Sequence, residues 1–148
     1  MARQPIRNPA LRPLAALIGR WPFELTFASA PATVRHGEAT FEWLDDGAFL
    51  VTRSICKDAI PPSTAVIGRD GPDGAWFYLY CDERGVSRVF AMRFEADVWM
   101  LERHGEPFPQ RFHGVLSADG RMLDGRWERQ DDNARWMLDL RIVYRRAV

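Results

Sequence analysis

The chain has 148 residues, 20 acidic and 20 basic side chains, and 47% hydrophobic residues. A chain of this length forms about one domain and buries enough apolar surface to fold without metal or disulfide support. The zero net charge provides no uncompensated field for a phosphate backbone, so we do not expect nucleic acid as a partner. Lys57 is the one lysine among the 20 basic residues, and six of the aromatic residues are tryptophan.

The N-terminal region carries no long apolar segment. Its longest apolar run, from Leu14 to Ile18, is too short for a secretory signal and far below the ~20 residues that span a bilayer. We therefore expect a cytoplasmic protein with no membrane partner. Cys56 and Cys81 lack the C-x-x-C spacing of zinc and redox sites, so we expect two reduced thiols, with a single disulfide between them as the alternative.

The first residues differ in character from the rest of the chain. Residues 1–12 show no apolar period and are expected to form a loose arm on the surface of a single domain, 13–148. Pro13 suits the first turn of a helix because its missing N–H would be unpaired there, and Gly19 can end that helix. The pattern predicts a helix of one or two turns.

From Trp21 onward the apolar period is two, and turn residues interrupt it at regular intervals, as in an all-β sandwich or barrel. Gly47, Gly85 and Gly120 fall where tight hairpin loops need a positive φ. Short connections favour antiparallel pairing of successive strands, and closure removes exposed edges. We therefore expect an all-β fold, an antiparallel meander of about ten strands closed into a β-barrel. The expected strands are 21–28, 33–44, 48–56, 64–69, 75–81, 86–94, 98–103, 108–117, 121–129 and 134–146.

Alternation along the strands, combined with hairpin loop lengths, predicts which side chains share a face. The prediction assumes a four-residue loop after Cys81, a three-residue loop after Phe94 and a three-residue loop after Ser117. It places Trp76, Tyr78, Tyr80 and Trp99 outside. The expected interior is Phe77, Leu79, Cys81, Val86, Phe90, Met92, Phe94, Val98, Met100, Val115, Leu123, Trp127, Trp136, Leu138, Leu140, Ile142 and Tyr144.

Four polar residues share this expected interior. A charge on an apolar face must be paired, hydrogen-bonded or close to water. Arg88 and Arg111 can present planar guanidinium groups to a carboxylate or phosphate of a ligand, and the alternative is an internal ion pair with Glu102 or Glu42. His113 is a ligand contact, a general base or a hydrogen-bonded core imidazole.

Gly19-Arg20-Trp21 follows the expected helix and opens the first strand, and it resembles the G-x-W signature of the lipocalin and calycin barrels. The resemblance implies a lipocalin-like barrel in which Trp21 closes one end. A basic residue of the last strand then packs on the tryptophan, either Arg145 or Arg146, and we assign Arg145 to this role.

A longer part of the chain, about 14–145, resembles a small uncharacterised β-barrel family, the DUF1579-like proteins of the lipocalin-like superfamily. That family comes with no settled activity. The segments that carry the resemblance are TFEWLDDGAFLVTRS, STAVIGRDG, YLYCDERGVSRVF, QRFHG and DGRMLDGRWE.

The chain also resembles, more distantly, the nitrobindin group of haem-binding barrels. Haem is therefore the cofactor to consider. Pro22-Phe23-Glu24 follows Trp21 where that group has a glycine-rich opening. The last histidine is His113, so the final strand lacks the haem-ligating histidine that the group carries. We therefore expect no cofactor.

No motif indicates a metal or a catalytic centre. The three histidines show no ligand spacing, the serines lack the context of a nucleophile elbow, and no glycine-rich phosphate loop precedes a helix. We expect neither a metal site nor a catalytic residue, and we favour a binding protein over an enzyme.

The leading hypothesis is a non-enzymatic barrel that binds a small hydrophobic or aromatic molecule with an anionic group. One alternative is an enzyme that uses the same cavity, with His113 as acid or base near Glu102. Another is an interaction module, open to homodimer formation, with a packed interior and outward aromatic residues. The expected ligand-binding residues are Arg88, Glu102, Arg111, His113, Phe90, Trp127, Trp136 and Tyr144.

Overall fold

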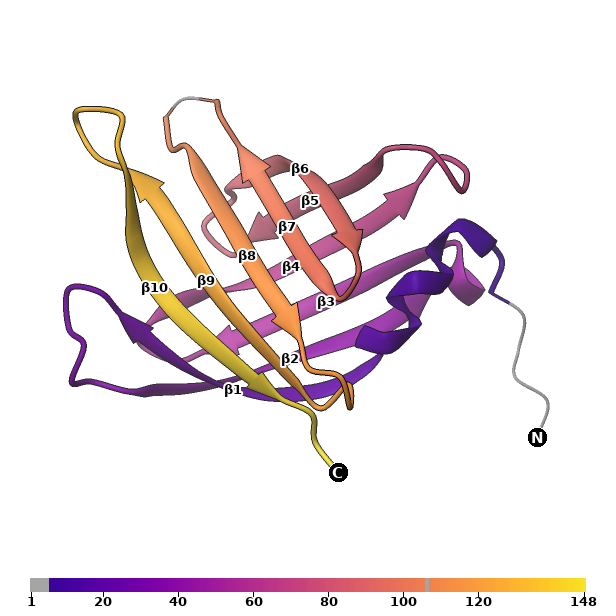
Figure 1. The fold of residues 1–148 in the computed structure, drawn as a ribbon, viewed down its shortest axis with the longest axis horizontal. Coiled ribbons are helices and arrows are strands. Elements are labelled where there is room, and N and C mark those ends of the chain that lie inside the picture. The colour runs from indigo at the N-terminus through magenta and orange to yellow at the C-terminus, as the bar shows by residue number, and fades with distance from the viewer. Residues whose placement is uncertain (1–5, 106) are drawn as a thin grey trace.

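The structure, a computed structural model, describes residues 6–105 and 107–148. Within them each strand pairs antiparallel with the next, and the first strand pairs with the last (Figure 1). The expected all-β, ten-stranded closed meander with a short N-terminal helix is confirmed. Its elements are η1 Pro9–Leu17, β1 Gly19–Phe27, β2 Arg35–Leu44, η2 Asp45–Gly47, β3 Phe49–Cys56, β4 Ile60–Arg69, β5 Trp76–Asp82, β6 Ser87–Glu95, β7 Val98–Arg103, β8 Gln110–Leu116, β9 Met122–Gln130 and β10 Trp136–Arg145.

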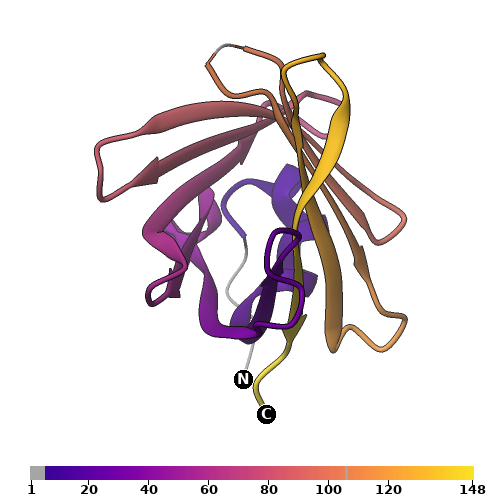
Figure 2. The same ribbon diagram turned by 90° about the vertical axis from the view of Figure 1, so that its left-hand side faces the viewer.

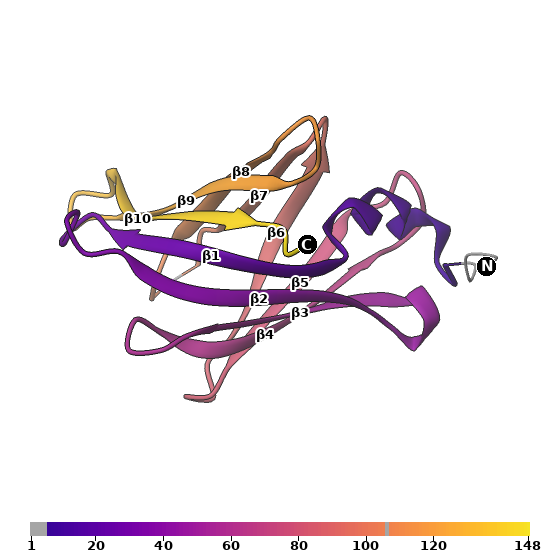
Figure 3. The ribbon, with the colours of Figure 1, turned by 90° about the horizontal axis from the view of Figure 1, so that it is seen from below.

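The seam of the barrel lies between β1 and β10, which run side by side (Figure 3). Phe23 is opposite Tyr144, and Leu25 is opposite Ile142. Because opposed residues of an antiparallel pair point to the same side, this register sends all four side chains into the barrel. The seam removes both edges of the sheet, as closure requires.

The N-terminal segment is more ordered than the sequence predicts. The 3₁₀ helix η1 begins at Pro9 instead of Pro13, and the Asn8 side chain accepts a hydrogen bond from the backbone N–H of Ala10 at 3.1 Å. Leu11 is fully buried. The expectation of a loose arm is therefore wrong for residues 9–12, because this leucine packs into the end of the barrel; residues 1–5 lie outside the described part.

The loop between β5 and β6 is one residue shorter than expected. The backbone N–H of Asp82 donates to the carbonyl of Val86 at 3.0 Å, and Gly85 takes the positive φ of 82° that the tight turn needs. Every side chain of β5 therefore faces the opposite way from the prediction. Phe77, expected inside, is 46% exposed, whereas the aromatic residues of β5 that were expected outside point inward: Trp76, Tyr78 and Tyr80.

The loop between β6 and β7 is also one residue shorter than expected. Glu95 is opposite Val98, so Ala96 and Asp97 alone make the turn, with φ of 50° and 63°. Two positive φ angles in succession are the geometry of a type I′ hairpin, which Asn-Gly usually supplies. The faces of β7 are reversed as a result, and Trp99, expected outside, is buried inside.

Two further irregularities set the faces of the last strands. The backbone N–H of Ser117 donates to the carbonyl of Met122, so the loop before β9 holds four residues where three were expected. The longer loop cancels the earlier error: β8 is reversed together with β7, and the faces of β9 are as predicted. A bulge between Leu138 and Leu140 then divides β10: Leu138 turns outward, and Leu140 and the alternate residues after it line the interior as predicted.

Trp21 closes one end of the barrel beside η1, as the G-x-W resemblance implies. Its indole N–H donates to the carbonyl of Leu17 at 2.8 Å, and the Arg146 guanidinium lies 4.3 Å from the centre of its ring. Arg146 also donates to the carbonyl of Ile18 at 2.6 Å. The assignment of Arg145 to this role is wrong, because alternation turns Arg145 outward, where it lies 3.7 Å from Glu24.

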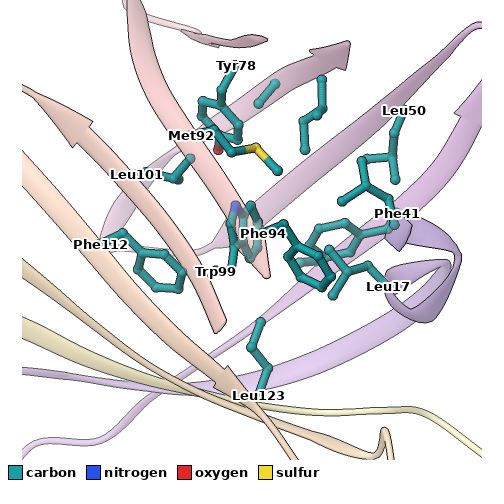
Figure 4. Close-up of a cluster of buried hydrophobic side chains, with 14 of the residues drawn as sticks. Leu17, Phe41, Leu50, Tyr78, Met92, Phe94, Trp99, Leu101, Phe112 and Leu123 are labelled. Atoms are coloured by element: carbon teal, nitrogen blue, oxygen red, sulfur yellow. The ribbon is translucent and has the colours of Figure 1, made fainter. Parts of the chain in front are cut away.

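The interior near η1 is densely packed with apolar side chains (Figure 4). Phe112 on β8 covers a pair of opposed glycines, Gly114 and Gly125. Its ring makes an edge contact with Trp99 at a centroid distance of 5.4 Å and a tilted contact with Trp127 at 5.1 Å. A side chain on either glycine would collide with the Phe112 ring. This half of the barrel is therefore closely packed.

Candidate functional site

The half of the barrel away from η1 holds a cavity of about 260 Å³. Its lining residues come from the strand segments remote from η1. Figure 2 views the barrel from this side, with η1 behind. Pockets for drug-sized ligands measure ~300–1,000 Å³, so this cavity suits a smaller molecule. A mixture of aromatic, small aliphatic and hydroxyl side chains lines it.

Small side chains on one wall create the space. The inward positions of β2, β3 and β4 here are Ala39, Thr52, Ser54, Ser63 and Ala65, all of which line the cavity. Large residues at these positions would fill the barrel, as leucine, isoleucine and phenylalanine do nearer η1. The cavity thus follows directly from side-chain volume at alternate strand positions.

Aromatic residues form the opposite wall. Phe90 on β6 lies at its centre, with edge contacts to Tyr78 at 5.7 Å, Tyr80 at 6.5 Å and Trp127 at 5.7 Å between ring centroids. Edge-to-face packing of this kind favours a fixed arrangement of rings. An apolar or aromatic ligand would therefore meet a preformed surface.

A carboxylate at the mouth of the cavity is fully engaged by its neighbours. Asp82 accepts hydrogen bonds from the Tyr80 hydroxyl at 2.8 Å and from the Arg84 guanidinium at 2.7 Å, and its side chain has no exposed surface. The hydrogen bonds from Arg84 hold the pKa of Asp82 well below its usual range. Burial and the bond to Asp82 raise the pKa of Tyr80 to about 12. The charge of Arg84 is thereby balanced by the carboxylate of Asp82.

Arg88, by contrast, is a cation of the cavity wall without a carboxylate partner among the described residues. Its guanidinium donates to the side-chain carbonyl of Gln110 at 3.0 Å and lies 5.6 Å from the Phe108 ring centre. Neither contact neutralises the charge. The alternative of an internal ion pair with Glu102 or Glu42 is wrong, because both carboxylates lie on the outer face.

Several hydroxyl groups in the cavity also lack partners. Tyr78 is 7% exposed and Thr52 8% exposed, and within the described residues neither hydroxyl makes a hydrogen bond to the protein. The same is true of the Tyr144 hydroxyl, and the indole N–H of Trp99 is buried without a partner. Burial raises the pKa of both phenols, so Tyr78 and Tyr144 stay protonated at neutral pH.

Half of the predicted ligand-binding residues lie at this cavity. The residues that the structure brings together there are Arg88, Phe90, Trp127 and Tyr144. The others lie on the outside of the barrel because the faces of β7 and β8 are reversed and because Trp136 precedes the bulge of β10. These outward residues are Glu102, Arg111, His113 and Trp136.

The outward residues form ordinary surface interactions. Arg111 lies 3.0 Å from Glu128 and 4.3 Å from the centre of the Trp136 ring. Glu102 pairs with His104 at 3.1 Å. His113 belongs to an outer groove lined by charged side chains. The pair of His113 and Glu102 therefore has no access to the cavity, which removes the basis of the enzyme hypothesis stated above.

The hairpin between β2 and β3 has Phe41 opposite Thr52 and Trp43 opposite Leu50. The inner face of this hairpin therefore combines the aromatic residues of β2 with Thr52 and Leu50 of β3. Glu42 points outward and lies 3.9 Å from Arg53.

Neither thiol forms a disulfide: Cys56 is buried and Cys81 partly exposed, and desolvation raises the pKa of Cys56. In residues 6–105 and 107–148, no three His, Cys, Asp or Glu side chains gather as a group able to hold a metal ion. No helix in that part of the chain has the length and apolar character needed to cross a membrane.

These features define a closed antiparallel β-barrel that is packed at one end and hollow at the other. The solved structure of Rv2717c from M. tuberculosis has the same fold, with a TM-score of 0.65 and 16% sequence identity over 95% of this chain and 98% of that chain. No protein-family model matches the sequence, and no curated protein matches it. The similarity at this level of identity concerns the fold alone.

The sequence reading missed Tyr78, Tyr80, Thr52 and Gln110 as residues of the cavity. The two tyrosines were predicted to point outward because the loop after β5 was expected to be one residue longer than it is. Asp82 is the signal that could have corrected the loop length. Its side chain accepts a hydrogen bond from the backbone N–H of Arg84 at 2.9 Å, and an Asp that bonds to the backbone two residues later is typical of a tight Asx turn.

Proposed function

We propose that the barrel binds a small hydrophobic or aromatic molecule bearing a carboxylate, and that it does so without a cofactor and without catalysing a reaction. The observation that carries the proposal is Arg88, a guanidinium without a carboxylate partner among the described residues, in the wall of a largely apolar cavity. A cation in such a place is stabilised by an anion that arrives with a ligand.

The arrangement favours a carboxylate over a neutral ligand. A guanidinium offers planar, paired N–H donors that match a carboxylate, and such charge-assisted bonds are about twice as strong as neutral ones. The apolar part of the ligand would lie against Phe90 and Trp127, which are held by their mutual edge contact at 5.7 Å.

The proposal is tested by calorimetric titration of the purified, ligand-free protein with decanoate, 4-phenylbutanoate and indole-3-acetate, each beside its methyl ester. Trp99 and Trp127 line the cavity, so tryptophan fluorescence supplies a second readout. We expect at least one acid to bind and its ester to bind more weakly. Arg88→Met should weaken binding of the acid by about 10- to 100-fold, the value of one charge-assisted hydrogen bond.

Arg93→Met is the matched control. Arg93 lies on the same strand as Arg88, is exposed, and points to the outside of the barrel. Its replacement removes an equal charge without touching the cavity, so the affinity should not change. Equal binding of acid and ester, unchanged affinity in Arg88→Met, or no binding of any acid in the set would each refute the proposal.

A further inference from the structure

Tyr78 is a largely buried side chain whose hydroxyl has no protein partner among the described residues and faces the cavity. It lines the cavity, is 7% exposed, and its hydroxyl makes no hydrogen bond within the described residues. Figure 4 shows its ring entering from β5 with the hydroxyl end toward the interior. Among the described residues, the one fully buried side-chain polar atom without a partner is the Trp99 indole nitrogen, so the Tyr78 hydroxyl is open to the cavity and can bond to a molecule there.

Tyr80, two residues away on the same strand, shows that this barrel can satisfy a phenol. Its hydroxyl donates to Asp82 at 2.8 Å. Tyr78 has no such acceptor, although both rings pack against Phe90. Of the two tyrosines of β5, the one nearer the packed half is therefore the one whose hydroxyl lacks a partner.

Tyr144 supplies a second unpartnered phenol from another strand. It lines the same cavity, and its ring is fixed by an edge contact with Phe23 at 5.3 Å. Its proximity contributes to the raised pKa of Tyr78, so the two hydroxyls are within electrostatic reach of each other. Both stay protonated at neutral pH and can donate to an uncharged oxygen.

The register gives the position of this donor relative to Arg88. Arg88 is opposite Tyr80, and Tyr78 is opposite Phe90, two residues closer to the packed half. Two residues of strand correspond to about 7 Å. A ligand whose carboxylate meets Arg88 would therefore bring atoms several bonds from that carboxylate to the Tyr78 hydroxyl.

We propose that the hydroxyl groups of Tyr78 and Tyr144 form a second polar subsite in the cavity, which selects ligands that carry an uncharged oxygen, as a ketone or hydroxyl group, on the apolar part of the carboxylic acid. The inference rests on the proposed function and narrows its ligand to oxo- or hydroxy-substituted acids. A single neutral hydrogen bond to such an oxygen is worth roughly a 2- to 12-fold change in affinity.

The test compares decanoate with decanoates that carry one ketone, or one hydroxyl group, at successive positions along the chain. The measured quantity is the ratio of the affinity of each substituted acid to that of decanoate. In the wild-type protein we expect this ratio to exceed one for positions remote from the carboxylate, by roughly 2- to 12-fold. Separate ketone and hydroxyl arms show which oxygen the subsite prefers.

Tyr78→Phe removes one hydroxyl and keeps the ring. We expect it to lower the ratio toward one while the affinity for decanoate is kept, and the double variant with Tyr144→Phe should remove what preference remains. Tyr80→Phe is the matched control: its hydroxyl is engaged by Asp82, so its loss should leave the ratio unchanged. Thermal unfolding of each variant verifies that the barrel is intact.

The outcomes separate this inference from the function on which it rests. Arg88→Met should weaken decanoate and its substituted forms by the same factor, because it acts on the shared carboxylate. If decanoate binds through Arg88 but the ratio never exceeds one, or is the same in Tyr78→Phe as in wild type, the second subsite is refuted and the carboxylate site stands. If no acid binds at all, both proposals fall.

Discussion

The two halves of the barrel interior are built from the same alternating strands, yet one is full and the other hollow. Near η1 the helix adds its own leucines, and Trp21 and Arg146 close the end. In the other half, Ala39 and Ala65 stand where bulky side chains would be needed to fill the space. The comparison teaches that the leucines of η1 and the size of the inward side chains, on an unchanged sheet, divide the interior into a packed part and a hollow part.

The largest effect is expected from a cavity made in the packed half. Leu17 is fully buried in the cluster that also holds Phe41 and Leu50 (Figure 4). Leu17→Ala should lower the free energy of unfolding by about 2–5 kcal/mol, because packed neighbours cannot collapse into the space. Urea denaturation measures it. The control Leu138→Ala, at an outward position that is 41% exposed, should cost less than about 1 kcal/mol; equal losses would show that this half is not the stabilising one.

Arg146 gives the next effect, because it joins the two ends of the chain at the closed end of the barrel. Arg146→Met removes the stack on Trp21 and the hydrogen bonds to Ile18 and Gly120. Loss of these contacts should cost about 1.5–3 kcal/mol of unfolding free energy. Arg145→Met removes an exposed ion pair and should cost less than about 1 kcal/mol. Denaturation midpoints of the two variants measured side by side decide between these residues, and a larger loss for Arg145→Met would reverse the assignment.

Alkaline pH should act selectively on the hollow half, because all three tyrosines of the chain line it. The folded-state pKa of Tyr80 is raised from 10.0 to about 12, and those of Tyr78 and Tyr144 are raised further by burial. The unfolded chain therefore loses these protons first. Stability that is fully present below pH 10 should decline as the pH rises from 10 toward 12 and beyond.

Apart from the two cysteines, of which Cys56 also has a raised pKa, few side chains of this chain titrate in the alkaline range. Lys57 is the one lysine, and the other basic residues are arginines that remain charged over this range. Absorbance at 295 nm reports tyrosinate, and urea midpoints at each pH report stability. We expect tyrosinate to appear together with unfolding. Full ionisation of the tyrosines near pH 10 in a folded protein would contradict the burial of these phenols.

The sequence was sufficient for the strand count, the closure and the tryptophan at the closed end. The strand count and the closure depend on patterns repeated over many residues, such as the period of two and the regular turns, so small errors do not accumulate. The tryptophan was placed by the G-x-W resemblance. The assignment of β6 and β9 to inner and outer faces was also correct. The sequence alone therefore predicts Arg88 and Phe90 as interior residues, as the structure has them.

The remaining site residues could not be predicted because a face assignment depends on the exact length of each loop. Ala96 adopts a positive φ that its residue type gives no reason to expect, which shortens one turn and reverses β7. Because β8 pairs with β7, this single residue also placed Arg111 and His113 on the wrong face. Side-chain period along a strand is two, so an error of one residue inverts the whole strand.

The smallest expected effect on stability comes from filling the hollow half. Ala65 lines the cavity, and Ala65→Leu adds three carbon atoms where there is space, so the unfolding free energy should change by less than about 1 kcal/mol while binding of the carboxylic acids is lost. The matched change in the packed half is Gly125→Ala. Its new Cβ would lie 2.6 Å from the Phe112 ring, which should cost about 1–3 kcal/mol for a single carbon. Urea denaturation of both variants, with titration of the first, gives the comparison. If Ala65→Leu is the more destabilising of the two, the space beside it is not available to a ligand, because a side chain that cannot be accommodated there leaves no room for a bound molecule either.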